Sequence, residues 1–151
     1  MLLPTAFAAM YAPQDGSGPW YGGGIEAVLL AWSDNSQAFG PSQGRIRFDV
    51  GALGSSKMDT STMVMYRGGA QVSIERNASR QWLIPYFDVD LGGLWTSQTG
   101  SRAFVDGGVG VYVLHRRGTI VDLEVDGLLP FREPQQLGGA RVQLAVSYSL
   151  W

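Results

Sequence analysis

The chain has 151 residues, a formal net charge of -2 and a sequence pI near 5.2. Its length fits a single domain covering residues 1–151, and its charge gives no reason to expect nucleic acid as a partner. The sequence contains no cysteine, which excludes a disulfide framework and thiolate metal sites. It also has no run of about 18 apolar residues, the length expected of a transmembrane helix.

Most of the sequence alternates apolar residues with polar residues or glycine, in runs of about ten to fourteen residues that end at turns. In one such run, Val121, Leu123 and Val125 are each followed by an acidic residue. Strict period-two alternation is typical of strands with one apolar face and one wet face. The runs exceed the usual soluble strand of about five or six residues. They match the roughly 9–11 residues with which a tilted strand crosses a bilayer.

Seven strands are predicted in chain order, over residues 20–32, 44–54, 62–75, 82–95, 103–115, 119–128 and 137–151. Pro85 cannot donate a ladder hydrogen bond, so it is expected near a strand end or at a bulge. Bacterial single-chain barrels have even strand numbers, and residues 5–12 form the only free segment for another strand. Residues 1–13 are also similar to the tail of a secretory signal, so they are either the first strand or a residual leader.

The predicted fold is therefore all-β, a closed up-and-down antiparallel transmembrane β-barrel with eight strands. The two shortest connections, 76–81 and 116–118, are two strands apart, as expected if both face the periplasm. The loops at 55–61, 96–102 and 129–137 are then extracellular, and none has an aromatic-rich binding pattern.

The polar face of these strands is predicted to line the lumen. It carries small residues that suit a narrow interior, namely Gly69, Gly92, Gly108 and Gly110. It also carries charges of both signs, which predict a paired internal network because buried charges must find partners. The predicted lumen charge network is Glu26, Arg45, Arg47, Asp49, Arg67, Glu75, Asp88, Asp90, Asp106, Asp122, Glu124 and Arg141. With Asp126 added, acids outnumber arginines by nine to four, so some acids must be solvated near a rim, protonated, or bound to something else.

Large aromatic residues near the ends of the strands predict a membrane-interface girdle, made of Trp20, Trp32, Trp95 and Tyr148. Strand length and girdle together favour a membrane barrel with its apolar face outward. The alternative is a soluble lipocalin-like barrel, whose apolar face would point inward around a ligand.

No catalytic residue, metal ligand or cofactor is predicted. His115 is the only histidine, and its place at a strand end beside two arginines is typical of a residue at the membrane interface. One imidazole without cysteine excludes a histidine-based metal site within one chain. The carboxylates of residues 122–126, with Asp88, Asp90 and Asp106, could bind Ca²⁺ or serve as an acid–base pair. Pairing with the lumen arginines is the favoured interpretation.

Two stretches look like the middle hairpins of small outer-membrane barrels: residues 85–96 (PYFDVDLGGLWT) and 104–112 (FVDGGVGVY). The resemblance covers roughly residues 62–151 and is to eight-stranded barrels of the OmpA/OmpX type and to PagL-like lipid A deacylases. Those deacylases carry a His-x-Ser-Asn motif on a late strand. The corresponding region here, residues 122–131, has no histidine or serine, so the resemblance does not extend to that activity.

Sequence pattern and resemblance together predict an outer-membrane β-barrel with a side-chain-filled lumen and no enzymatic activity. Its role would be structural, anchoring or in envelope assembly, with outer-membrane lipid and envelope proteins as partners. Two alternatives stay open. One is an outer-membrane lipid-modifying hydrolase of the PagL-like type, with His115 as its only credible base. The other is the soluble ligand-binding barrel.

Overall fold

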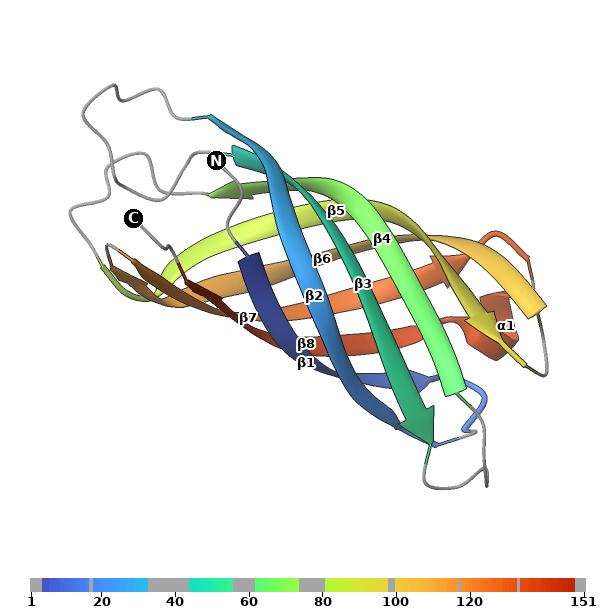
Figure 1. Ribbon diagram of the computed structural model, residues 1–151. Helices are drawn as coiled ribbons and strands as arrows, with labels where there is room; N and C mark the ends of the chain where they lie inside the picture. The colour runs from blue at the N-terminus through green and yellow to red at the C-terminus, as the bar shows by residue number, and fades with distance from the viewer. Residues whose placement is uncertain are drawn as a thin grey trace.

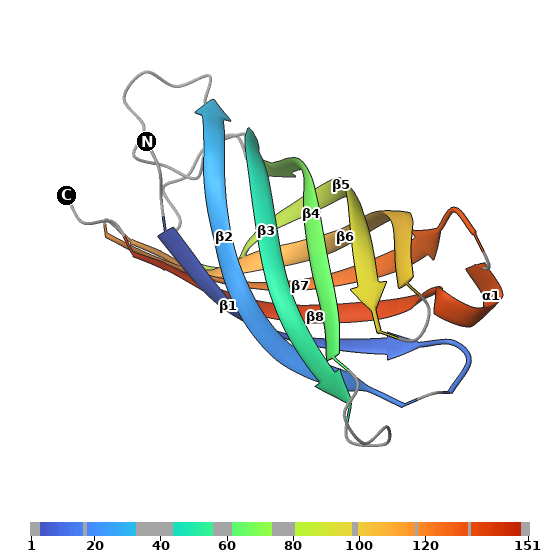
Figure 2. The same ribbon diagram turned by 45° about the vertical axis from the view of Figure 1, so that its right-hand side comes forward.

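The computed structural model describes residues 4–16, 18–32, 44–55, 62–73, 81–97, 100–116, 118–132 and 134–148. They form eight strands: β1 (Pro4–Pro13), β2 (Trp20–Trp32), β3 (Gly44–Ser55), β4 (Thr62–Ser73), β5 (Ile84–Thr96), β6 (Gly100–Arg116), β7 (Thr119–Pro130) and β8 (Gly139–Tyr148). Each strand pairs antiparallel with the next, and β1 pairs antiparallel with β8, which closes the barrel (Figures 1 and 2). The predicted closed eight-stranded fold is confirmed.

The first predicted strand is present as β1, whose register with β8 runs from Thr5 opposite Ser147 to Pro13 opposite Gly139. Several strand boundaries differ from the prediction by one to three residues. β5 begins at Ile84 rather than at residue 82, because Leu83 adopts a positive φ of 55° that a strand cannot continue through. Pro85 is the second residue of β5, so its expected place near a strand end is confirmed.

A four-residue helical turn, α1 (Pro134–Leu137), precedes β8. The sequence pattern does not predict this turn and places the start of the last strand at residue 137. The N–H of Gly138 donates to the Pro134 carbonyl at 2.8 Å, which closes the turn and delays the strand. Among the described residues, no helix is long and apolar enough to cross a membrane.

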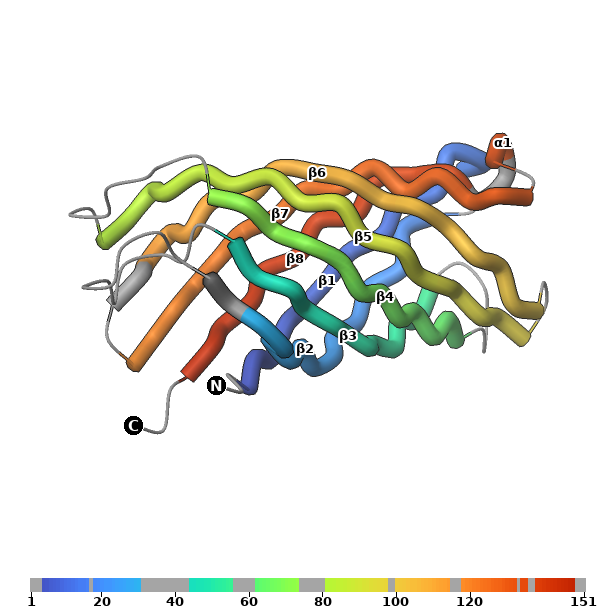
Figure 3. The backbone as a smooth tube through the Cα atoms, turned by 90° about the horizontal axis from the view of Figure 1, so that it is seen from above, coloured from blue at the N-terminus to red at the C-terminus, as the bar shows by residue number. Residues whose placement is uncertain are grey.

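The two ends of the barrel differ. β1 begins and β8 ends at one end, called here the termini end, and α1 lies at the other, called the α1 end (Figure 1). The strands run obliquely around the wall between these ends (Figure 3). Two β-bulges interrupt the alternation, at Leu29 in β2 and at Val113 in β6. After the first bulge, the adjacent Leu29 and Leu30 are both exposed, because an extra residue shifts the face on which the following side chain lies.

Side chains on the two faces of the wall are sharply different. The outer face is apolar, with exposed residues such as Leu91, Val109, Val125 and Val146. The inner face is layered along the barrel axis. An apolar plug fills the α1 end, the charged residues fill the middle, and Ile84, Tyr86 and Tyr112 pack together toward the termini end. The apolar plug consists of Phe7, Ala9, Tyr11, Trp20, Leu53, Met63, Met65, Leu94, Phe104, Leu128 and Ala145.

Candidate functional site

Every residue of the predicted lumen charge network that the structure describes lies inside the barrel and is at most 4 % exposed. Glu75 lies outside the described residues. Period-two alternation explains the shared direction, because successive side chains of a strand point to opposite faces. Arg45, Arg47 and Asp49 therefore enter the lumen from one face of β3, and Asp122, Glu124 and Asp126 from one face of β7.

Arg47 bridges β3 to two strands that are not its neighbours. Its Nη1 donates to Glu124 Oε2 on β7 at 2.5 Å, and its Nη2 donates to Asp90 Oδ2 at 2.7 Å and Asp88 Oδ2 at 3.2 Å on β5. Glu26 on β2 lies 3.6 Å from the same guanidinium. A single arginine thus connects carboxylates from three other strands.

Arg67 on β4 forms the second centre of the network. Its Nε donates to Asp49 Oδ2 at 2.6 Å, and its Nη1 donates to Asp126 Oδ2 at 2.7 Å and to Asp106 Oδ2 at 3.0 Å. Its Nη2 donates to Glu124 Oε1 at 2.5 Å. Charge-assisted bonds of this kind are roughly twice as strong as neutral ones, so Arg67 is the most strongly engaged of the lumen cations that the structure describes.

The other two arginines each contact an aromatic ring as well as polar groups. Arg45 donates to Gln71 and, at 3.5 Å, to Asp122, and its guanidinium lies 5.1 Å from the Tyr112 ring centroid. Arg141 donates to Gln143 and lies 5.4 Å from the Phe7 ring centroid. These contacts are within the range of cation–π attraction. They join the charged middle of the lumen to its two apolar ends.

Glu124 is the acceptor that both central arginines share. Its two oxygens receive Arg47 and Arg67, and the Tyr86 hydroxyl also donates to Oε2 at 3.1 Å. Tyr86, Gln71 and Gln143 were not among the predicted site residues, although all three have the inward parity of their strands. That parity was the signal that would have identified them.

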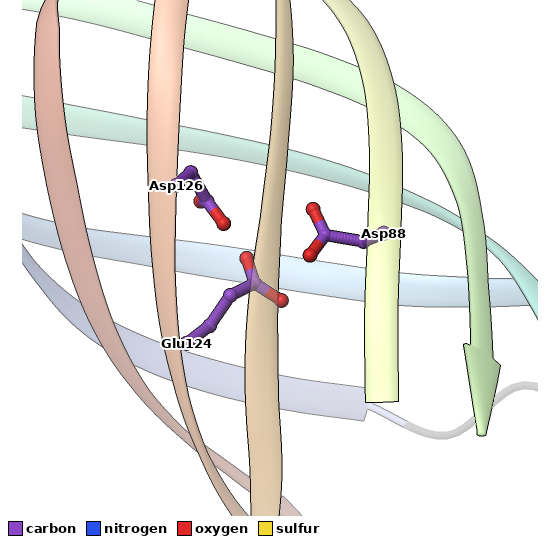
Figure 4. A group of neighbouring side chains, drawn as sticks. All are labelled: Asp88, Glu124 and Asp126. Atoms are coloured by element: carbon purple, nitrogen blue, oxygen red, sulfur yellow. The ribbon is translucent and has the colours of Figure 1, made fainter. Parts of the chain in front are cut away.

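Three carboxylates form the tightest acidic group: Asp88, Glu124 and Asp126 each place an oxygen within 4.8 Å of the others (Figure 4). Oxygen ligands at this spacing could hold a cation such as Ca²⁺. Arg47 and Arg67, however, already donate to oxygens of these three residues. The arrangement is therefore that of an ion-pair network in which guanidinium groups take the place of a metal ion.

Acids still exceed arginines inside the barrel. Among the residues that the structure describes, the buried acids are Glu26, Asp49, Asp88, Asp90, Asp106, Asp122, Glu124 and Asp126, and the buried arginines are Arg45, Arg47, Arg67 and Arg141. All eight acids are at most 4 % exposed, so solvation near a rim does not account for the excess. Arg47, Arg67 and Arg141 each lie within ion-pair distance of two or more carboxylates.

Inward glycines make room for these long side chains. Gly69 pairs in register with Arg47 on one side and Asp90 on the other, and Gly108 pairs with Asp88 and Asp126. A Cβ atom on Gly69 would overlap Asp90 Oδ1, and one on Gly108 would overlap Asp126 Oδ1. The lumen is therefore full at the level of the network.

The predicted girdle residues have different positions. Trp95 and Tyr148 face outward and are 46 % and 59 % exposed. The side chain of Trp32 lies outside the described residues. The prediction for Trp20 is wrong: this side chain is only 5 % exposed and belongs to the apolar plug. Trp20 has the same parity as Glu26 in β2, so it points into the barrel, where the α1 end needs a large apolar residue to fill it.

No family model and no curated protein matches the chain. Solved structures do match it over nearly its whole length. The N-terminal β-barrel domain of Pseudomonas aeruginosa OprF matches with a TM-score of 0.60 and 13 % identity, covering 97 % of this chain and 96 % of that chain. Neisserial surface protein A (NspA) matches with a TM-score of 0.63 and 12 % identity, covering 97 % of this chain and 94 % of that chain. The fold is that of small eight-stranded outer-membrane barrels.

A de novo designed protein, TMB2.3, also matches, with a TM-score of 0.51, 14 % identity, and coverage of 99 % of this chain and 94 % of that chain. Similarity at such low identity concerns the backbone arrangement. The charged lumen and the apolar plug are features of this chain's own residues.

Proposed function

We propose that this protein is an outer-membrane β-barrel with a sealed lumen and a structural, anchoring or envelope-assembly role, and that it is not an enzyme. The observation that carries the proposal is the direction of the side chains. Exposed aliphatic and aromatic residues cover the outer wall, whereas the eight acids and four arginines of the charged network are buried inside. An apolar outer band around a polar interior is the arrangement of transmembrane barrels.

A soluble ligand-binding barrel needs the opposite arrangement, with apolar residues lining an interior cavity. Here the middle of the interior is charged, and the outer wall exposes large side chains such as Ile25, Leu29, Leu91 and Val109. Soluble monomers rarely expose contiguous apolar surface on that scale. Contact with lipid would remove this surface from water.

The filled interior supports the absence of a pore. The apolar plug closes the α1 end, and the network centred on Arg47 and Arg67 fills the middle. Eight-stranded barrels have an interior just wide enough for side chains to fill. The proposed role is therefore that of a stable membrane element whose exposed ends and outer wall carry its interactions.

The proposed orientation places the termini end in the periplasm and the α1 end outside. Residues 117–118 form the whole connection between β6 and β7 at the termini end, and this short turn is the feature that supports the orientation. The predicted short connection at 76–81 is wrong: β4 and β5 are joined by residues 74–83, and the second shortest connection is 97–99 at the α1 end. The α1 end, which carries the connection containing α1, would then meet the outer leaflet.

Extraction of isolated membranes tests the location. We expect the protein to stay in the membrane pellet after washing with sodium carbonate and with urea, because its outer wall is in contact with lipid. Purified protein should also migrate differently in SDS gels with and without boiling, as a folded barrel that resists detergent. Complete release by either wash would refute the membrane assignment.

Conductance in planar bilayers tests the sealed lumen separately. Protein that has inserted, as judged by protease protection in vesicles, should give no large and stable openings. Stable openings of porin size would show that the plug and the network do not block the barrel, and would replace the structural role with that of a channel.

A further inference from the structure

A small surface pocket lies at the α1 end, between the start of β6 and the residues that follow β7. Its lining consists of Ser101, Arg102, Ala103, Phe131 and Arg132, and its volume is about 220 Å³. The N–H of Phe131 donates to the Ala103 carbonyl at 3.0 Å. This bond continues the β6–β7 ladder past Pro130 and fixes one wall of the pocket against the other.

The described lining of this pocket is cationic. Arg102 and Arg132 contribute two guanidinium groups, Ser101 contributes a hydroxyl, and no acidic residue is among the lining residues that the structure describes. Arg102 Nη1 donates to the Ser101 carbonyl at 3.2 Å, which holds this guanidinium close to the pocket wall. Guanidinium groups favour phosphate, because each presents a planar fork of donors to two oxygens at once.

The surroundings of the pocket are apolar on the side of the membrane band. Phe131 is 65 % exposed and Leu129, two residues earlier in the chain, is 57 % exposed. Trp95 is exposed on the outer wall and pairs in register with Ser101. A cationic pocket therefore stands directly beside the edge of the apolar outer wall, and this juxtaposition matches a molecule with an anionic head and an apolar tail.

We propose that this pocket binds the phosphate group of a membrane lipid in the outer leaflet, between Arg102 and Arg132, with the acyl chains against Phe131 and Leu129. The proposal rests on the proposed function, since it needs the α1 end to lie at the outer-leaflet surface. The volume of the pocket supports a headgroup rather than a whole ligand, because sites for drug-sized molecules are larger, roughly 300–1,000 Å³.

Native mass spectrometry of the full chain, released from maltoside micelles, provides the test. The probes are dioleoyl phosphatidic acid, dioleoylglycerol, which has the same chains without phosphate, and inorganic phosphate. We expect the wild-type protein to bind phosphatidic acid and to bind the other two at least tenfold more weakly, because both the phosphate and the chains contribute. Arg132→Gln should weaken phosphatidic acid binding about tenfold, and the Arg102→Gln/Arg132→Gln double variant more strongly.

Gln81→Glu is the matched control, because it changes the net charge by the same amount as Arg132→Gln at an exposed residue of the opposite end. It should leave phosphatidic acid binding unchanged. Arg132 is exposed, so Arg132→Gln decides the question even if the double variant fails to fold.

Three results would overturn this site. They are equal binding of phosphatidic acid by Arg132→Gln and the wild type, equal binding of dioleoylglycerol and phosphatidic acid, or binding of inorganic phosphate as tight as that of the lipid. The last result would assign the site to free phosphate. Failure of the proposed function gives a different outcome, since the wild-type protein would then be released from membranes by carbonate or urea.

Discussion

Arg67→Gln and Asp106→Asn remove opposite partners of one buried ion pair, yet we expect them to change stability by very different amounts. Arg67 Nη1 lies 3.0 Å from Asp106 Oδ2. If the two groups formed an isolated pair, removing either one would leave the other buried and uncompensated. In this lumen the two costs differ, because the acids outnumber the arginines.

The magnitude follows from the contacts of each partner. Five carboxylates lie within 3.1 Å of Arg67, namely those of Asp49, Asp90, Asp106, Glu124 and Asp126. Removing one partner of a buried pair costs about 3–5 kcal/mol, and here the loss of one cation leaves several acids facing one another. Arg67→Gln should therefore lower the free energy of unfolding by at least about 3–5 kcal/mol.

Asp106→Asn should lower the free energy of unfolding by no more than about 1 kcal/mol, because the lost charge-assisted bond is offset by weaker repulsion among the remaining acids. Urea titration of each variant in phospholipid vesicles, followed by tryptophan fluorescence and extrapolated linearly to zero urea, measures both values. A cost for Asp106→Asn as large as that of Arg67→Gln would refute the reasoning, since it would show that the acid excess has no energetic effect.

Two further pairs of substitutions examine the wall and the packing of the lumen. Leu123→Arg, on the outer face of β7, should impair insertion or destabilise the barrel by roughly 2–4 kcal/mol, whereas Asp122→Asn on the inner face should be tolerated. The heat resistance of the two variants in SDS gels compares them. Equal sensitivity of the two variants would contradict the assigned faces. Gly108→Ala should destabilise the barrel because its Cβ would overlap Asp126 Oδ1, whereas a Cβ at the adjacent Gly107 would lie at an ordinary 3.5 Å from the Asp88 carbonyl oxygen. Urea titration should therefore give a lower midpoint for Gly108→Ala than for Gly107→Ala. Equal midpoints would mean that the lumen has spare room.

The fold was predictable because a barrel repeats one simple pattern. Alternation assigned faces along β3 and β7 without any knowledge of the strand pairing, and the inward direction of Arg47 and Glu124 followed directly. Their contact with each other did not follow. It depends on the stagger of β3 against β7 across the lumen, and alternation within one strand carries no information about stagger.

Three features that the sequence pattern misplaced or missed have physical explanations. Trp20 was assigned to the girdle because tryptophan is common at membrane interfaces, although its parity in β2 points inward. The apolar plug was missed for a different reason. Its residues lie on the otherwise polar face of their strands, where apolar residues were not expected. α1 went unpredicted because four residues are too few for helical periodicity to be visible.

The reach of Arg47 sets a limit on the circumference of this protein. From β3 its guanidinium contacts Asp90 on β5 and Glu124 on β7, across the full width of the interior. Barrel diameter grows with the number of strands, so in a wider barrel the same side chain would fall short of the opposite wall. The ion pair between Arg47 and Glu124 joins opposite walls, so it needs a sheet that is curled into a barrel, because an open sheet holds β3 and β7 apart. An open sheet would therefore leave this pair of buried charges unmatched. The reach of the lumen arginines therefore fits a barrel of one diameter.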